Sequence, residues 1–235
     1  MKQDKKFKSN VKYFTTSEAF KFIGLGLILL SVVLYFVGSG WSFWSWLILS
    51  IGTPIGFILF LISTGRSTDE EINTYIQLHT KEISADDISF EKGFKKRILD
   101  RCEPIYFEGY DFDGDVMVAK AKNGRIVSSV YTKAIIFPLD TGINVTYKTV
   151  SIISDDVKEG SIDIDYSEIQ SFKMEDERKQ IVFGKNTFSP RDIRLIINYS
   201  DSKTITLPMQ DNMDTENFIN KINEMMKKAK ETSAE

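Results

Sequence analysis

Cysteine and histidine are almost absent from this 235-residue chain, which contains one of each, Cys102 and His79. A disulfide within the chain is therefore excluded, and so is a metal site built from the His and Cys residues of one chain. A Ser-His-Asp triad would have to use His79, and the sequence contains neither a Gly-rich phosphate loop nor a Gly-x-Ser-x-Gly turn. We therefore predict no catalytic residue, no cofactor and no metal, and expect a protein that is not an enzyme.

A strong charge of one sign is also lacking, because 30 Lys and Arg residues stand against 33 Asp and Glu residues, for a net charge of −3. The part of the chain after residue 63 shows no basic stripe with interleaved aromatic residues, which is the usual footprint of nucleic-acid binding. We expect no nucleic-acid partner.

Two long apolar runs without any charge are present near the N-terminus, at residues 22–37 and 43–62, and five residues separate them. At about 1.5 Å per residue in a helix, each run can cross most or all of a hydrocarbon layer about 30 Å thick. The runs predict a two-helix transmembrane hairpin over residues 22–63. A cleaved signal peptide fits less well, because no small-residue cleavage site is evident and a second run follows at once.

The charges around the hairpin predict its orientation. Residues 1–21 carry six lysines against two acidic residues, whereas the connection at 38–42 is uncharged. Lys-rich flanks stay on the cytoplasmic side, so we expect a basic cytoplasmic tail over residues 1–21, two spans in the cell inner membrane and both termini in the cytoplasm. Trp41, Trp44 and Trp46 lie where an outer interfacial belt is expected.

Small residues and a proline interrupt the second run, at Gly52, Pro54 and Gly56. Such residues favour close packing of two membrane helices, with a bend at the proline. The alternative is the hinge of a transporter. Neither run has an ionisable residue in its interior, although such residues usually mark an ion route. We therefore interpret the three positions as packing positions and keep the hinge as the alternative.

A juxtamembrane helical linker is predicted over residues 67–101. Ser67 or Thr68 with an acidic residue three positions later is a capping-box pattern, and apolar residues then recur at helical spacing as far as Ile83. A second and weaker helical face begins near Ser84 and is broken by Gly93.

From residue 102 the sequence changes to short β-rich runs separated by turn residues, which predicts a β domain over residues 102–230. Asn123-Gly124 predicts a two-residue hairpin turn. Apolar residues alternate with aspartates from Ile162 to Tyr166, which predicts one buried and one solvated face. An amphipathic helix from Phe218 to Ala229 is expected to cover the open end of the sheet. The expected antiparallel strands are 105–110, 116–121, 125–136, 143–153, 161–169, 181–183, 193–199 and 204–207.

Three segments carry a resemblance to bacterial pleckstrin-homology-like (PH-like) and GRAM-like domains. Residues 142–153 are similar to the family's Gly-apolar-Thr strand, residues 162–169 to its strand with a Tyr-x-x-Ile step, and residues 195–218 to its strand-to-helix order. The resemblance spans residues 105–230. It implies an α+β membrane protein whose transmembrane hairpin is followed by a cytosolic PH-like β-sandwich or open barrel closed by a C-terminal helix.

A membrane anchor with a PH-like domain and no catalytic set predicts a binding or assembly module. We expect protein–protein scaffolding at the inner membrane face, with the bilayer and a protein partner or a second copy of the chain as partners. A sensor of anionic lipid is an alternative, because Lys120, Lys122 and Arg125 flank the Asn123-Gly124 turn and each could add about 1 kcal/mol of attraction. A small oligomeric transporter or pore subunit is another alternative.

Alternating carboxylates surround a glycine at Asp111, Asp113 and Asp115, as they do in calcium loops. Val116 stands where the EF-hand order requires glycine. We interpret the segment as a β-turn, with calcium as the less favoured alternative.

Overall fold

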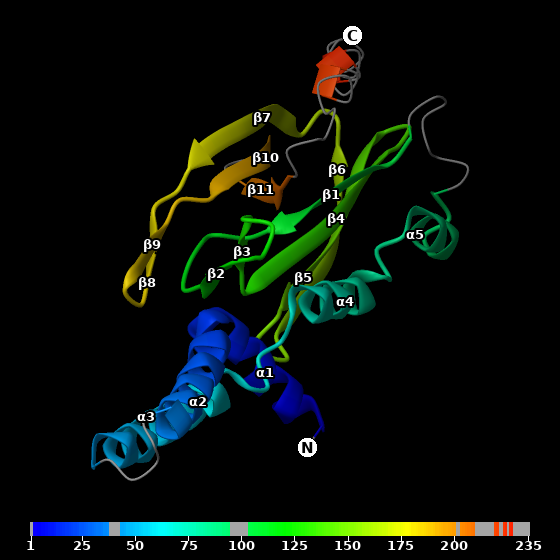
Figure 1. Ribbon diagram of the computed structural model, residues 1–235. Helices are drawn as coiled ribbons and strands as arrows, with labels where there is room; N and C mark the ends of the chain where they lie inside the picture. The colour runs from blue at the N-terminus through cyan, green and yellow to red at the C-terminus, as the bar shows by residue number, and fades with distance from the viewer. Residues whose placement is uncertain are drawn as a thin grey trace. The chain divides into compact units, whose positions relative to one another are not determined.

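The protein is α+β, with two apolar helices near the N-terminus and a C-terminal part rich in β-sheet (Figure 1). The chain divides into two compact units, Met1–Ile72 and Asn73–Glu235, and each is described by itself. The computed structural model describes residues 2–37, 43–94, 103–200, 203–209, 219–220, 223–224 and 226–227.

The first unit is helical. Helices α2 (Ala19–Val37) and α3 (Phe43–Ser63) form the predicted pair, and each contains an 18-residue window long and apolar enough to cross a membrane, with mean hydropathies of 2.3 and 2.1. Helix α1 (Lys2–Thr15) lies in the segment expected only as a basic tail. The sequence reasoning did not anticipate this helix.

Glycine forms the closest contact between α2 and α3. A Cβ atom on Gly24 would lie 2.5 Å from the carbonyl oxygen of Gly56, and one on Gly56 would lie 2.6 Å from the carbonyl oxygen of Gly24. A Cβ atom on Gly52 would overlap the hydroxyl of Ser31. The two backbones can approach this closely because these positions have no side chain. Gly52 and Gly56 thus lie in the helix contact, whereas Pro54 is exposed within α3.

The predicted linker contains two helices, α4 (Asp69–Thr80) and α5 (Ala85–Glu91). The backbone N–H of Thr68 donates to Glu71 Oε2 at 2.8 Å, and the N–H of Glu71 donates to Thr68 Oγ1 at 3.2 Å. The predicted capping box is therefore confirmed. Helix α5 ends before Gly93, whose φ of +67° is left-handed. Residues 95–102 lie outside the described part of the chain.

The β unit contains two main antiparallel sheets. The first has the order β1-β4-β5-β6, and its strands are Ile105–Tyr110, Val130–Pro138, Gly142–Ser151 and Val157–Asp165. The second has the order β11-β10-β7, and its strands in chain order are β7 (Ile169–Arg178), β10 (Arg191–Tyr199) and β11 (Lys203–Pro208). Two separate hairpins pair β2 (Val118–Lys120) with β3 (Ile126–Ser128) and β8 (Ile181–Phe183) with β9 (Asn186–Phe188).

The strand prediction was wrong at four places. The run 125–136 is two strands, β3 and β4, which pair in different sheets. The buried Ser129 joins them, and Oγ of the preceding Ser128 accepts the N–H of Val130. The break is not marked by Gly or Pro. The expected strand 161–169 ends at Asp165, and the following strand β7 was missed because it carries more charged than apolar residues. Strand β9 was missed too.

The hairpin predicted at Asn123-Gly124 is confirmed, but its loop has three residues. The N–H of Ala121 donates to the carbonyl oxygen of Arg125, and the N–H of Gly124 donates to that of Ala121, both at 2.9 Å. Lys122, Asn123 and Gly124 therefore form the loop. Gly124 has a φ of +87°, the left-handed conformation that a three-residue hairpin loop requires at this position.

The core of the β unit contains inward-facing residues of both main sheets, among them Phe107, Ile136, Leu195 and Ile197. The predicted alternation in β6 is confirmed, because Ile164 is buried between the exposed Asp163 and Asp165. The described residues near the C-terminus are helical, and Ile219 and Met226 among them pack against this core. The rest of the predicted C-terminal helix lies outside the described residues.

Candidate binding site

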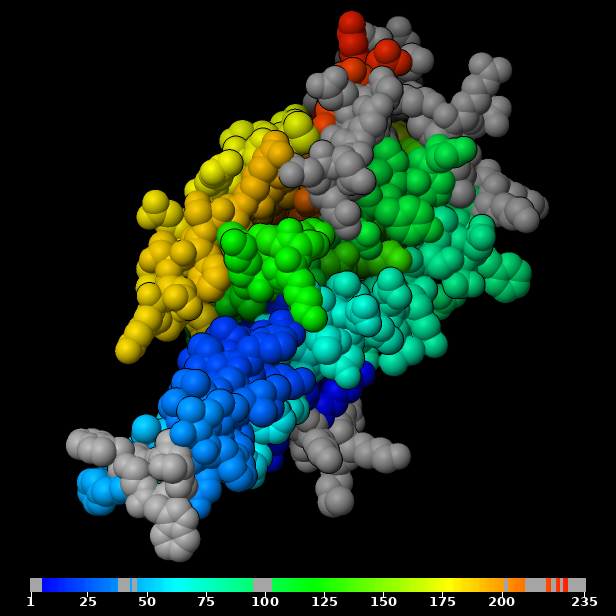
Figure 2. Space-filling model, in the orientation of Figure 1, coloured from blue at the N-terminus to red at the C-terminus, as the bar shows by residue number. Residues whose placement is uncertain are grey.

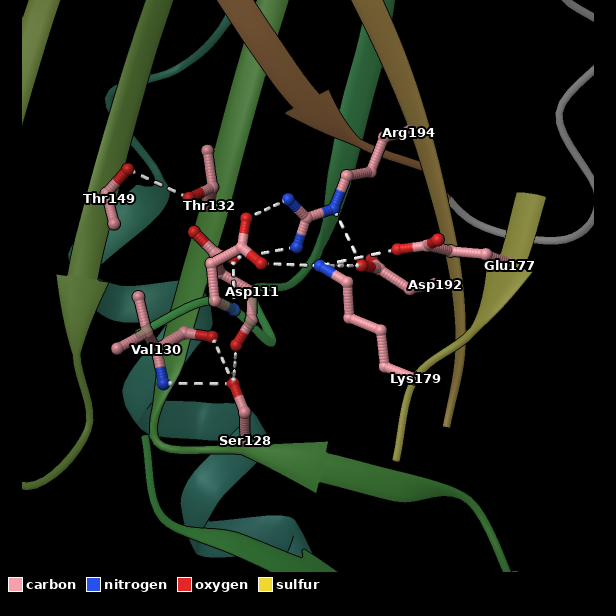
Figure 3. Close-up of polar contacts among 10 residues, drawn as sticks. Asp111, Ser128, Val130, Thr132, Thr149, Glu177, Lys179, Asp192 and Arg194 are labelled. Atoms are coloured by element: carbon pink, nitrogen blue, oxygen red, sulfur yellow. Dashed lines mark hydrogen bonds and ion pairs between the residues drawn. The ribbon is translucent and has the colours of Figure 1, made fainter. Parts of the chain in front are cut away.

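A network of ion pairs joins three separate segments of the β unit (Figure 3). Asp192 and Arg194 lie two residues apart on β10, so their side chains point to the same face. Arg194 Nε lies 2.7 Å from Asp192 Oδ2, and Arg194 Nη2 lies 3.2 Å from Asp111 Oδ1. Lys179, which follows β7, places Nζ 2.7 Å from the same Asp192 oxygen. Asp113 accepts from both cations.

The ion pairs are needed because one of the carboxylates, that of Asp192, is buried. The side chain of Asp192 is 1% exposed, and a carboxylate in such a place is stable only when cations or hydrogen-bond donors surround it. Hydrogen bonding from Arg194 holds the pKa of Asp113 below its usual value. Burial alone would lower the pKa of Lys179, but its bonds to Asp113 and Asp192 raise it. The ion pairs fix the loop after β1 to the end of β7 and the start of β10.

A cleft of about 430 Å³ lies beside this network. Its walls come from the end of β1, from the β2–β3 hairpin and from the segment that leads into β10. The ion pairs join the loop after β1 to the start of β10. Figure 2 shows the green surface of the hairpin beside the gold surface around β10. The residues that line the cleft are Tyr110, Phe112, Gly124, Arg125, Ile126, Ser189, Pro190, Arg191, Asp192, Ile193 and Met209.

Arg125 is the unneutralised charge of this cleft. Arg191 is paired with Asp176 through two bonds of 2.9 and 2.7 Å, and Asp192 is paired with two cations. The guanidinium of Arg125 makes no hydrogen bond or ion pair with any residue in the described part of the chain. It lies over the ring of Tyr110 instead, with Cζ 5.4 Å from the ring centroid, a cation–π contact.

Tyr110 is itself held in place. Its ring packs edge-on against the ring of Tyr131, with centroids 5.1 Å apart. Tyr131 is buried, and this burial together with the nearby carboxylate of Glu108 raises the pKa of its hydroxyl. Two packed aromatic rings thus fix the surface against which the guanidinium of Arg125 lies.

A second cleft, of about 360 Å³, shares Tyr110 and Arg125 with the first. Its lining is polar, and Lys133 supplies a second cation, which lies 5.6 Å from the ring of Tyr106. The two clefts therefore meet at Arg125, and the first has more apolar residues in its lining than the second. The lining of the second cleft consists of Asn73, Ile76, Gln77, Thr80, Glu108, Tyr110, Arg125, Tyr131 and Lys133.

The three basic residues singled out in the sequence thus occupy different places. Arg125 lines both clefts, whereas Lys120 at the end of β2 and Lys122 in the loop are exposed and line neither. Sequence reasoning missed Lys179, Asp192 and Arg194. A signal was present, because two charged residues alternate with apolar ones at the start of β10, which is otherwise an apolar strand.

The acidic turn at 111–115 uses its carboxylates within the protein. Asp111 Oδ1 accepts the N–H of Asp113 at 3.0 Å, which forms an Asx turn, and Gly114 follows with a φ of +73°. Asp111 and Asp113 bind Arg194 and Lys179, as described above. In the part of the chain that the structure describes, no group of three or more His, Cys, Asp or Glu side chains is arranged to hold a metal ion.

Comparison with protein-family models, with curated proteins and with solved structures finds no match to this chain.

Proposed function

We propose that the protein is a membrane-anchored, PH-like binding module that holds an acidic segment of a partner protein at the inner membrane face. The observation that supports this most directly is Arg125, a cation without a carboxylate partner among the described residues, fixed on an aromatic ring where two clefts meet. The proposal contains three parts, an anchor, a fold and a ligand, and each has its own support.

The anchor is supported by where α2 and α3 place their side chains. In each candidate span 11% of the 18-residue window is buried, whereas the core helix of a soluble protein would be mostly buried. Large apolar side chains point outward, among them Phe22 at 67% and Val37 at 78% exposure. Surfaces of this kind are stable in hydrocarbon and costly in water. The lysines of residues 1–21 favour a cytoplasmic N-terminus.

The PH-like fold is supported by the order of the strands. Leaving out the two small hairpins, four strands form one antiparallel sheet and the next three form another, and helical residues near the C-terminus pack on the core between them. This is the arrangement that the resemblance implies. The β2–β3 hairpin, which carries Arg125, is an insertion between the first two strands of that arrangement.

The ligand class follows from the shape and charge of the clefts. A volume of a few hundred Å³ suits a few side chains, and Arg and Tyr are the residues most often found at the energetic centre of protein interfaces. An extended peptide could place a carboxylate on Arg125, an apolar side chain in the first cleft and polar groups in the second. Strand addition at a sheet edge is less well supported, because β7 carries five charged residues, which discourage such pairing.

Binding of defined peptides tests the ligand. The full chain is placed in zwitterionic nanodiscs and titrated with fluorescent peptides in which Glu alternates with Leu or Phe. We expect Arg125→Glu to weaken binding at least tenfold and Arg125→Lys to weaken it less. Lys120→Glu, on the same hairpin but outside both clefts, is the matched control and should leave affinity unchanged. Equal affinity for matched peptides with Gln in place of Glu would contradict the proposal.

The same protein tests the lipid alternative. Co-flotation of these nanodiscs with anionic vesicles that weakens on Lys120→Glu, Lys122→Glu and Arg125→Glu alike would favour lipid sensing over peptide binding. Indifference of co-flotation to all three substitutions would remove that alternative.

Labelling of cysteines tests the anchor. In spheroplasts treated with a membrane-impermeant maleimide, Ser39→Cys in a Cys102→Ser background should react without lysis, since it lies between the spans. The natural Cys102 should react only after lysis. The reverse pattern would contradict the proposed orientation, and reaction of both without lysis would contradict a two-span anchor.

A further inference from the structure

Helix α1 is fastened to the segment by which the chain leaves α3. Ser67 Oγ donates to Asn10 Oδ1 at 2.7 Å, and the hydroxyl of Tyr13 donates to Asp69 Oδ1 at 2.6 Å. Asn10 is 1% exposed and Tyr13 is 2% exposed. One face of α1 is therefore packed against residues 67–69.

Arg66 closes this contact at the C-terminal end of α1. Its Nε and Nη2 each donate to the carbonyl oxygen of Tyr13 at 3.3 Å, and its Cζ lies 4.7 Å from the centroid of the Tyr13 ring. Arg66 Nη1 also lies 3.7 Å from Glu18 Oε2, between α1 and α2. A cation that binds the last carbonyls of a helix stabilises that end. The start of α2 and the end of α3 are thus held together with α1, and Figure 1 shows α1 at this end of the pair.

The bond made by Lys12 shows which side of α1 is turned toward the spans. Lys12 Nζ donates to the carbonyl oxygen of Thr64 at 2.9 Å, and Thr64 directly follows the last residue of α3. Positions four and seven residues apart lie on one side of a helix, so helical spacing assigns positions 5 and 8, both lysines, to the same side as Lys12. The side chain of Lys8 is exposed. We call Lys5, Lys8 and Lys12 the basic stripe.

We propose that α1 is an interfacial helix whose basic stripe binds the headgroups of anionic lipids. The inference rests on the anchor of the proposed function, and it is independent of Arg125 and of the β unit. If α3 ends at the membrane surface, the bond between Lys12 and Thr64 puts the stripe at the depth of the headgroups. Phosphate groups there have the opposite charge, and a helix parallel to the surface can bring several lysines to them at once. A lipid surface is favoured because anionic headgroups lie at the end of an apolar span and carry the charge opposite to that of the stripe.

Photo-crosslinking tests the inference on the full chain in nanodiscs. One preparation contains photoactivatable phosphatidylglycerol and the other photoactivatable phosphatidylcholine, and mass spectrometry maps the labelled peptides. We expect peptides from α1 to take up at least fivefold more phosphatidylglycerol than phosphatidylcholine. The excess should fall as salt is raised, because exposed charges are screened.

Charge variants locate the site. Lys5→Gln with Lys8→Gln should abolish the excess, whereas Lys5→Arg with Lys8→Arg should keep it. Lys12 is left intact because its bond to Thr64 helps to position α1. The matched control, Lys120→Gln with Lys122→Gln on the β unit, should leave labelling of α1 unchanged.

The outcomes separate this inference from the proposed function. If the chain enters nanodiscs but both lipids label α1 equally, or if the excess survives the Gln variant, the basic stripe does not bind anionic lipid and the anchor stands. If the excess depends on Lys120 and Lys122 instead, the site lies on the β unit and the inference is wrong. If the chain does not enter nanodiscs, the anchor fails and this inference fails with it.

Discussion

The two units of this protein place the same kinds of side chain in opposite positions. In the helical unit Phe36 is 74% exposed and glycines form the contact between α2 and α3. In the β unit Phe107 and Leu195 are 0% exposed and form the core. Apolar side chains gain stability only on leaving water, so this inversion is expected when one unit is surrounded by hydrocarbon and the other by water.

Polar groups differ between the units as well. Among the described residues of α2 and α3 no charged side chain lies beyond Lys21, and the polar contacts of the first unit gather around α1 and residues 64–69. The β unit instead buries charge, at Asp192, and surrounds it with Arg194 and Lys179. Substitutions in each unit can therefore test whether buried ion pairs stabilise the β unit and close glycine packing stabilises the helical unit.

The largest effect is expected from breaking the buried network. Arg194→Ala leaves Asp192 buried with a single remaining cation, and removal of one partner from a buried pair costs about 3 kcal/mol or more. Hydrogen exchange of β10 with increasing urea measures the change. Arg191→Ala on the same strand is the matched control, because its pair with Asp176 is exposed and its loss should cost much less stability. Equal losses would show that burial does not set the cost.

A smaller effect is expected from filling the glycine contact of the helical unit. Gly56→Leu forces α2 and α3 apart, and overpacking of this kind costs about 1–3 kcal/mol. All three tryptophans lie at positions 41–46, so tryptophan fluorescence during an SDS titration reports this unit selectively. Gly26→Leu is the control, because a Cβ atom there meets no atom within 4 Å. An unchanged midpoint for Gly56→Leu would contradict packing by small residues.

An effect of about 1 kcal/mol is expected where the chain passes from one unit to the other. Thr68→Ala removes half of the capping box, and loss of such a cap typically costs this amount. Faster hydrogen exchange in the first turn of α4 measures it. Thr15→Ala, whose hydroxyl bonds to the carbonyl oxygen of Val11 within α1, should leave α4 unchanged.

The smallest effect is expected from acid. The folded β unit lowers the pKa of Asp113, chiefly through Arg194, so the carboxylate adds stability that is fully present above its ordinary pKa of about 3.9. This contribution is lost as the pH falls below that value through the folded pKa. Urea midpoints of β10 exchange between pH 6 and pH 3 measure the loss. Asp113→Asn should flatten the curve in this range, and an unchanged slope would exclude Asp113 as its source.

Features that depend on neighbouring residues were predicted well. The two apolar runs, the capping box at Thr68 and the alternation of β6 follow from periods of 3.6 and 2 that can be read in a short window. Strand β7 was missed because its edge position allows charged residues where a central strand would have apolar ones. The break between β3 and β4 was missed because a buried serine replaces the usual turn residues.

The candidate site could be predicted only in part. Arg125 was singled out from its place beside a turn, but the sequence grouped it with Lys120 and Lys122. The fold separates them, because it places Arg125 over the ring of Tyr110 and in the lining of both clefts, whereas the two lysines line neither. Asp111 and Asp113 were noticed as a calcium-like pattern. Their partners Lys179 and Arg194 are far away in the sequence, so the ion pairs could not be predicted from it.

The amino-acid sequence by itself determined which segments are apolar enough to span a membrane, which segments form most of the helices and strands, and which chemistries lack their residues. These properties depend on composition and on short-range periodicity. Tertiary structure decided the long-range polar contacts, as shown by the ion pair of Arg194 with Asp111, 83 positions apart, and the hydrogen bond of Lys12 with the carbonyl of Thr64, 52 positions apart. Such contacts form only when the hydrophobic core and the glycine contact have brought distant segments together, so the geometry around Arg125 and α1 is a property of the fold.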